Sequence, residues 1–307
     1  MEKLFKKYLI HLLFIIVNIS CNEGPLQYPE PPTGWEDGTC QSLQIQSPIN
    51  IPSFNDESLV IDNGIHATIK DLAYSAVKSA SVAFDHSHKW TTKELDIGFI
   101  EIELNGTLYK YKLNSIHFHL YSEHRIDSKQ YPMEMHIVHK NTNKADKDNE
   151  NLVVGVLFDY KNDKNNKFLD DMNLASEKNI QGANILSLIK KEDEFFYYKG
   201  SLTTVPCTEN VNWIVFKDVK DMSVRQFSKF KSWIENSDQQ YYGVGYGNAR
   251  GIKRLSGRKI YLENLKKKEP SIGVYLLVSL PIATLFLYPI NIFNYHLFLK
   301  NKAGVIS

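Results

Sequence analysis

Two short stretches, Ile116-His117-Phe118-His119 and Met133-Glu134-Met135-His136-Ile137-Val138-His139, decide the fold and the chemistry of this chain. Both suit β-strands, in which successive side chains point to opposite faces. His117 and His119 therefore share one face of the first strand. If the second strand lies beside it, His136 can complete a group of three imidazoles. Three neutral imidazoles with an open fourth position form the donor set of a catalytic zinc site, whereas a structural zinc site takes four protein ligands.

The residues around His117, His119 and His136 distinguish these three from the other histidines of the chain as candidate metal ligands. The chain contains 10 histidines, and His86 and His88 form a second His-x-His pair. That pair stands among charged and polar neighbours, so we interpret it as a solvated turn. The first pair is followed closely by Ser122-Glu123-His124, and Glu134 lies two residues before His136. A carboxylate on the same strand face as a histidine favours a metal site.

Six segments, taken in order, resemble the α-class carbonic anhydrases. They are Gln46-Ser47-Pro48-Ile49-Asn50-Ile51, Ile116-His117-Phe118-His119, Ser122-Glu123-His124, Glu134-Met135-His136-Ile137-Val138-His139, Gly200-Ser201-Leu202-Thr203-Thr204 and Val211-Asn212-Trp213-Ile214-Val215-Phe216. The resemblance runs from about Trp35 to about Tyr261. It implies a mainly β fold, in which a single domain holds a large, twisted, mostly antiparallel central sheet and a few short helices. The metal would lie at the bottom of a conical cleft.

The resemblance also implies a reaction and its residues. Zn²⁺ would be held by His117, His119 and His136, and a zinc-bound hydroxide would hydrate carbon dioxide reversibly to bicarbonate and a proton. The Thr203 hydroxyl, next to Thr204 in the same catalytic loop, would accept a hydrogen bond from the hydroxide and donate one to Glu123. The resemblance further makes Glu134 the partner of His136, and Asn248 and Arg250 a supporting pair.

Carbon dioxide is apolar and needs an apolar wall beside the metal. By resemblance, this wall consists of Val138, Val153, Leu202, Val211 and Trp213. The spacing agrees, because Val138 shares a strand face with His136 and Val211 shares one with Trp213; ordinary core packing would give the same pattern. Ser115 stands where the family usually has a glutamine that holds the first ligand, so we expect weaker zinc affinity.

Turnover also needs a group that carries the proton away from the metal. The resemblance places Lys78 where fast family members have a histidine, and His66, His86 or His88 are alternatives. A lysine with a pKa of about 10.4 is a poor proton acceptor at neutral pH. We therefore expect an active enzyme whose rate depends on buffer.

Composition and local patterns bound the remaining possibilities. The chain has 307 residues, is 43% hydrophobic and carries a net charge of +1. Its length and hydrophobic content allow one large domain over residues 22–265, and its charge gives no sign of a nucleic-acid partner.

Asn105-Gly106 predicts a hairpin turn, and Asn105-Gly106-Thr107 is a glycosylation acceptor in a secreted protein. Residues 223–235 show helical apolar spacing, with Ser223 and Gln226 as a capping box.

Both ends of the chain are unusual. Residues 1–21 combine early lysines, an apolar run and small or polar residues, the order of a secretory signal peptide; a lipoprotein cleavage at Cys21 is the alternative. Residues 271–299 contain no Asp, Glu, Lys or Arg, which predicts a membrane anchor. A removed lipid-anchor signal is the rival, disfavoured by Lys300 and Lys302 behind the apolar run. The signal peptide would place the domain on the extracellular or lumenal side.

Of the 3 cysteines, Cys40 and Cys207 occupy positions that several extracellular members of the resembled family link by a disulfide. Secretion permits such a bond, and two free buried thiols are the alternative.

A second function is also possible: a catalytically silent carbonic anhydrase-like module for binding or adhesion at the cell surface. Such relatives usually lose a metal histidine, and this chain keeps all three. An esterase using the same hydroxide is a third possibility, as a side activity.

Overall fold

A computed structural model describes residues 40, 44–52, 58–60, 66–78, 82–84, 90–92, 95–174, 180–237 and 248–265. The chain divides into the units Met1–Leu265 and Lys266–Ser307, and every described residue belongs to the first. The predicted signal peptide, residues 1–21, and the predicted anchor, residues 271–299, lie outside the described residues. Within the described part of the chain, no helix has the length and apolar character needed to cross a bilayer.

Strands dominate the described residues. They are β1 (Asn50–Ile51), β2 (Leu59–Val60), β3 (Ala67–Tyr74), β4 (Val82–Phe84), β5 (Trp90–Thr92), β6 (Gly98–Leu104), β7 (Thr107–Leu120), β8 (Arg125–Ile126), β9 (Lys129–Gln130), β10 (Met133–Asn141), β11 (Asn151–Asp159), β12 (Phe195–Ser201), β13 (Glu209–Phe216), β14 (Lys220–Asp221) and β15 (Ile260–Glu263). The helical elements are the 3₁₀ turns η1 (Lys147–Asn149) and η2 (Ile185–Ser187) and the α-helices α3 (Lys167–Met172) and α4 (Val224–Ser237).

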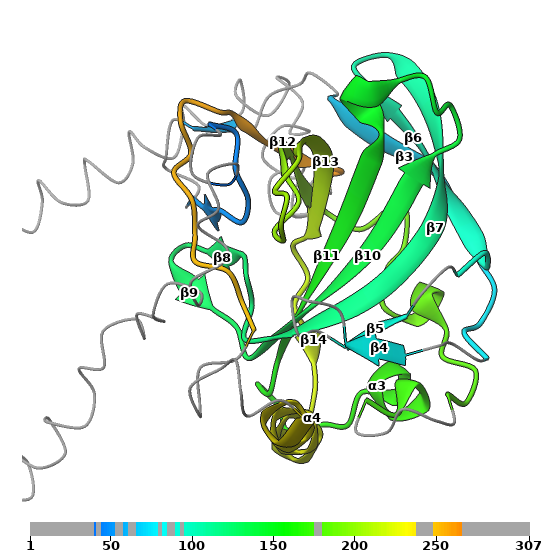
Figure 1. Cartoon of the computed structure of the whole chain (residues 1–307), viewed down its shortest axis with the longest axis vertical. Coiled ribbons are helices and arrows are strands. Elements are labelled where there is room, and N and C mark those ends of the chain that lie inside the picture. The colour runs from blue at the N-terminus through cyan, green and yellow to red at the C-terminus, as the bar shows by residue number, and fades with distance from the viewer. Residues whose placement is uncertain are drawn as a thin grey trace, which may run out of the picture. The chain divides into compact units, whose positions relative to one another are not determined.

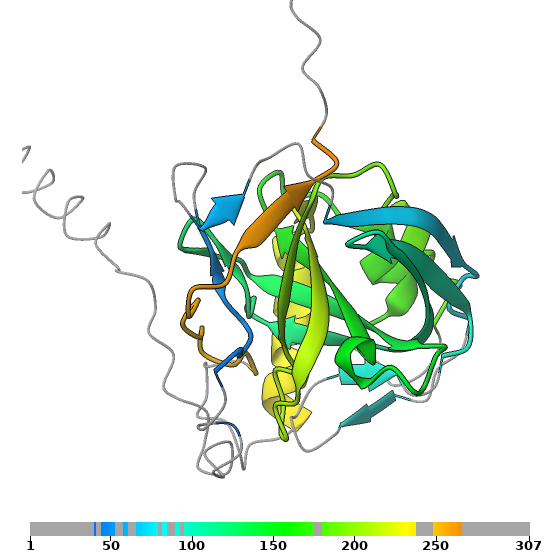
Figure 2. The ribbon, with the colours of Figure 1, turned by 90° about the horizontal axis from the view of Figure 1, so that it is seen from above.

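A 12-stranded sheet forms the centre of the unit (Figure 1). Its main path runs β2-β15-β12-β13-β11-β10-β7-β5-β4, with β6 beside β7, β3 beside β6, and β14 beside β11. Figure 2 shows the late strand β15 beside the central strands, although it is far from them in sequence. Within this sheet the pairs β11–β13, β11–β14 and β2–β15 are parallel and the other pairs are antiparallel, while β1, β8 and β9 form a separate three-stranded sheet. The predicted mainly β fold with a large, mostly antiparallel sheet is confirmed.

Local sequence signals explain several boundaries. Asn105 and Gly106 both have positive φ, +48° and +82°, and join β6 to β7, as the two central residues of a type I′ hairpin turn require. The predicted capping box is also present: Ser223 N donates to Gln226 Oε1 at 3.1 Å, and Gln226 N donates to Ser223 Oγ at 3.2 Å. These two bonds satisfy backbone donors that a helix start leaves unpaired.

The alternation along each strand divides the core into two clusters. One contains Met133, Met135 and Ile137 of β10, and packs against Phe230 and Ile234 of α4, which lies at the end of the sheet near β14 in Figure 1. The other, on the opposite face, contains Val153, Val211, Trp213 and Val215, with Val138 and Leu202 against it. The even-numbered residues 134, 136 and 138 of β10 therefore face away from the helices.

His139 is fully buried and its Nε2 lies 2.8 Å from the Tyr74 hydroxyl. Burial lowers the pKa of this imidazole to about 4. Because the unfolded chain takes up this proton near pH 6.5, stability should fall as the pH drops from about 6.5 towards 4. Between pH 7 and 4.5 this one group should cost about 2 kcal/mol.

The variant His139→Gln tests this effect, because it keeps a hydrogen-bonding group without the titration. Urea unfolding of wild type and variant at both pH values gives the two losses of stability. We expect the wild-type loss to be larger by about 2 kcal/mol. Equal losses in the two proteins would show that His139 does not contribute to acid sensitivity.

Candidate metal centre

The pairing of β7 with β10 brings the three predicted histidines together. The strands are antiparallel, with His117 opposite His136 and His119 opposite Glu134. The ring centroids of the three histidines lie 4.6 to 5.0 Å apart, and all three side chains are buried. The register shifts between Val138 and His139. This β-bulge leaves the strict alternation at the histidines undisturbed and alters the strand pairing only farther out.

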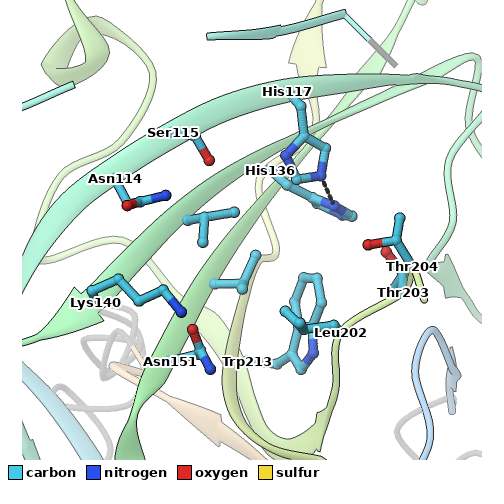
Figure 3. A pocket seen from close by; sticks show the side chains of 12 residues that line it. Asn114, Ser115, His117, His136, Lys140, Asn151, Leu202, Thr203, Thr204 and Trp213 are labelled. Atoms are coloured by element: carbon cyan, nitrogen blue, oxygen red, sulfur yellow. Dashed lines mark hydrogen bonds between the residues drawn. The ribbon is translucent and has the colours of Figure 1, made fainter. Parts of the chain in front are cut away.

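The donor atoms fit a tetrahedral zinc ion. One ring nitrogen from each of His117, His119 and His136 lies within 4.8 Å of the others, and His117 Nε2 is 3.1 Å from His136 Nδ1 (Figure 3). Zinc–nitrogen bonds of about 2.0–2.1 Å would separate two ligand nitrogens by about 3.3–3.4 Å. The other ring nitrogens of two ligands are already engaged, since His119 Nδ1 donates to Asn248 O at 3.1 Å and His136 Nε2 lies 2.8 Å from Glu134 Oε1.

Glu134 is the hub of a buried hydrogen-bond chain. Its Oε1 contacts His136 Nε2 and, at 2.7 Å, His124 Nδ1, while its Oε2 accepts from His124 N at 2.8 Å. Burial alone would raise the pKa of Glu134, but His124 and His136 hold it well below its usual range. The carboxylate is therefore ionised, and it fixes the orientation of the His136 ring.

The chain of hydrogen bonds continues beyond Glu134. His124 Nε2 lies 2.7 Å from the Tyr198 hydroxyl, which lies 2.9 Å from Ser47 Oγ. The group His124, Glu134 and His136 is also close enough to hold an ion, but hydrogen bonds already engage its ring nitrogens and carboxylate, so we assign it a supporting role. The roles of His124 and Tyr198 could not be predicted from the sequence, because no spacing rule connects positions so far apart in the chain.

Glu123 is the second buried carboxylate of the site. Its Oε1 accepts a hydrogen bond from Arg250 N at 2.9 Å, and Thr203 interacts with it through its side chain. Burial raises the pKa of Glu123 to about 7, and the interactions with Thr203 and Arg250 oppose this shift. Arg250 also donates from Nη1 to Gln46 Oε1 and to Ser47 O. Thr203 and Glu123 therefore interact, and the direction of the hydrogen bond between them stays a prediction.

A cleft of about 220 Å³ opens in front of His117 and His136 (Figure 3). Of the predicted residues, Ser115, Val138, Val153, Leu202, Thr203, Thr204 and Trp213 line it. Val211 is buried in the same apolar cluster as Val153 and Trp213 but does not line the cleft. Asn248 is not among the residues that line the cleft. Its side-chain Oδ1 accepts a hydrogen bond from Leu120 N at 2.6 Å.

Lys78 is not among the described residues that line the cleft. It is exposed and follows Val77, which bridges to Ala183. His66 stacks on Tyr261 instead, and His86 and His88 lie outside the described residues. The only lysine lining the cleft in the described part of the chain is Lys140, which sequence analysis did not single out. Its place two residues after Val138, on the same strand face, could have identified it.

The Cys40–Cys207 disulfide forms as predicted, with the two Cα atoms 5.3 Å apart. Cys207 also holds the loop that carries the threonines, because its backbone N–H donates to Thr204 O at 2.7 Å. Gln46 Nε2 donates to Cys207 O at 3.0 Å. The bond therefore joins the N-terminal segment to the loop that contains Thr203.

Comparison with known proteins identifies the family. Residues 30–264 match the model of the eukaryotic-type carbonic anhydrases. Alpha carbonic anhydrase 8 of Arabidopsis thaliana is 27% identical over 80% of this chain and 60% of its own length, so the chain spans less than two thirds of that relative. Alpha carbonic anhydrase 3 of the same plant is 30% identical, covering 76% of this chain and 79% of its own.

A solved structure agrees in fold. The carbonic anhydrase of Chlamydomonas reinhardtii in complex with acetazolamide shares 28% identity with this chain at a TM-score of 0.62, over 79% of this chain and 98% of that one. The family model, the relatives and the sheet with its buried histidines all point to one group of enzymes. This chain belongs to the eukaryotic-type carbonic anhydrase family.

Proposed function

We propose that this protein is a zinc-dependent enzyme that interconverts carbon dioxide with bicarbonate and a proton. The observation that carries the proposal is the convergence of His117, His119 and His136 on one buried point facing the cleft. The partners of these rings support it, because the contacts of His119 with Asn248 and of His136 with Glu134 orient the rings as ligands. Three histidines leave one coordination position open to the cleft.

His117, His119 and His136 would hold Zn²⁺, which would supply hydroxide at neutral pH by lowering the pKa of bound water to about 7. The residues of the chain direct this nucleophile. Thr203 donates its hydroxyl hydrogen to the Glu123 carboxylate, which leaves the hydroxyl oxygen to accept a hydrogen bond and fix the direction of attack. The apolar side chains of Val138, Val153, Leu202 and Trp213 offer carbon dioxide a surface from which water is easily displaced.

Two measurements on the purified full chain test this function. We expect zinc bound at one site and acceleration of carbon dioxide hydration in a stopped-flow assay. The alternative, a catalytically silent module, predicts neither. The preserved triad of histidines, with Glu123, Glu134 and Thr203 in place, favours the enzyme. Protein that binds no zinc and leaves hydration at the uncatalysed rate would overturn the proposal.

Replacing Thr203 by valine should lower kcat/KM for carbon dioxide about 10- to 100-fold. Valine keeps the shape of threonine but cannot link the nucleophile to Glu123. Because Thr203 is not a metal ligand, the zinc content should stay that of wild type. A matched control is Thr204→Val, which changes a neighbouring hydroxyl in the cleft but should have the smaller effect. Equal effects of the two variants would argue against the assigned role of Thr203.

Proton removal should limit turnover at low buffer concentration. Among the described residues that line the cleft, Lys140 is the only titratable side chain besides two metal ligands, and an ammonium is a poor acceptor at neutral pH. Lys78, the predicted shuttle position, is not among the described residues that line the cleft. We expect kcat for hydration to rise with imidazole concentration at constant pH and then saturate. A flat response from the lowest buffer concentration would show that an internal shuttle exists.

We further propose that the protein enters the secretory pathway, that residues 271–299 anchor it to a membrane, and that Asn105 carries a glycan. The disulfide supports an oxidising compartment, and Asn105 is exposed at the tip of a hairpin. Mass spectrometry of the mature protein tests all three points at once. Retention of residues 1–21, loss of the apolar tail, or an unmodified Asn105 would each remove the corresponding proposal.

A further inference from the structure

The outer half of the cleft differs chemically from its floor. Along β10, the cleft-facing residues are His136, Val138 and then Lys140. Strand geometry places the Cα of Lys140 about 13 Å beyond that of His136. Asn114 and Asn151 also line the cleft, and Figure 3 shows them with Lys140 on the side away from Thr203 and Thr204, which we call its mouth.

The charges around Lys140 favour an anion. Lys112 lies directly opposite Lys140 on β7, and like charges in such a cross-strand pair repel each other. Two carboxylates are near: Glu150, 3.5 Å from Lys140 Nζ, and Asp96, 3.6 Å from Lys112 Nζ. Glu150 is shared, however, because Lys147 lies 3.3 Å from its other oxygen. The charge of Lys140 is therefore only partly balanced by its ion pair with Glu150.

Asn151 supplies an acceptor as well. Its side chain is 5% exposed, and its buried Oδ1 has no hydrogen-bond partner among the described residues. A buried acceptor without a donor carries an uncompensated desolvation penalty, so a ligand that brings a donor would be favoured there. Asn151 also begins β11, which pairs with β10 in a register that places it opposite Lys140. The ammonium and this amide therefore belong to one site.

We propose that Lys140, Asn151 and Asn114 form a subsite for a small oxyanion that carries an O–H group, and that its ligand is bicarbonate. The ammonium and the Asn114 amide would donate hydrogen bonds to the carboxylate oxygens, while the bicarbonate O–H would donate to Asn151 Oδ1. The choice of bicarbonate rests on the proposed function, whereas the subsite itself does not. Its distance from the histidines makes it a holding position between solvent and the metal.

Direct measurement of bicarbonate binding tests the subsite better than kinetics does. The equilibrium constant of carbon dioxide hydration fixes the ratio of kcat/KM for hydration to kcat/KM for dehydration, so any variant must change both by the same factor. The side-chain amide signals of Asn151 and Asn114 in ¹⁵N-labelled, zinc-loaded full chain are titrated with bicarbonate at constant pH and ionic strength. We expect a saturable shift. Lys140→Gln should weaken the affinity about threefold to fivefold, as expected for a half-exposed ion pair. The Asn114 signal should report a comparable loss in Asn151→Leu.

Three comparisons make the result decisive. Lys110→Gln removes a surface lysine of β7 that pairs with Glu101 outside the cleft, and should leave the affinity unchanged. Nitrate, a planar anion without an O–H group, should bind more weakly than bicarbonate to wild type, and Asn151→Leu should abolish that preference. His119→Ala should keep the subsite even though it loses hydration, which separates this proposal from the catalytic one. Unchanged affinity in Lys140→Gln, or equal binding of nitrate and bicarbonate, would overturn the assignment.

Discussion

Replacing His119 by alanine should eliminate both zinc binding and the hydration of carbon dioxide. Only two imidazoles, His117 and His136, would remain to hold the ion, and a catalytic zinc site needs three protein ligands. The His119 ring is buried and held by the backbone carbonyl of Asn248, so alanine would leave a gap at this ligand position. Metal analysis after dialysis and a stopped-flow hydration assay measure the two losses.

A matched control separates loss of the metal from general damage. His139→Gln changes another buried histidine of the same sheet, on the strand that carries His136, and at pH 7.5 it should keep both zinc and activity. If His119→Ala retained stoichiometric zinc with wild-type turnover, the metal would have to be held elsewhere. The proposed function would then lose the observation on which it depends.

Removing the disulfide should have the largest effect on stability. Cys40 and Cys207 are 167 residues apart in sequence, and the chain-entropy model assigns about 5 kcal/mol to closing a loop of this length. Domains of this kind are stable by only about 5–15 kcal/mol. The double variant Cys40→Ser/Cys207→Ser should therefore unfold at much lower denaturant concentration, with a larger slope m, because the unfolded chain without the bond exposes more surface.

The loop containing Thr203 should respond as well, because Cys207 is hydrogen-bonded to Thr204 and Gln46. We expect faster hydrogen exchange at residues 203–207 in the double variant. Wild type treated with a thiol reductant offers a control, since it lacks the bond without any substitution and should unfold like the double variant. A double variant as stable as wild type would mean that the unfolded chain is constrained by other means.

The sequence predicted the parts of this protein that depend on local periodicity. Alternation in β7 and β10 placed His117, His119 and His136, and the two-residue turn at Asn105 and Gly106 follows from the need for positive φ. The capping box at Ser223 was also readable, because it involves two residues only three positions apart. In each case the determining interaction is either local or between strands that share a clear pattern.

Long-range contacts were not readable in this way. The chain from Glu134 through His124 and Tyr198 to Ser47 joins four separate segments, and it depends on how the sheet folds back on itself. Lys78 is exposed and is not among the described residues that line the cleft; its role in proton transfer stays a prediction, because an aligned position in a loop does not fix where the side chain lies. Asn114 and Asn151 reach the mouth because of strand pairing, a register that composition cannot supply.

The β-bulge after Val138 has a consequence for how such a protein could change. The irregular pairing starts only beyond the histidines, so an extra residue at the entrance does not turn the ligand rings over to the apolar side of the sheet. Mutations among Asn114, Lys140 and their neighbours can alter which molecules are admitted, while the reaction at the floor is preserved. Selectivity and chemistry are thereby separately adjustable along a single pair of strands.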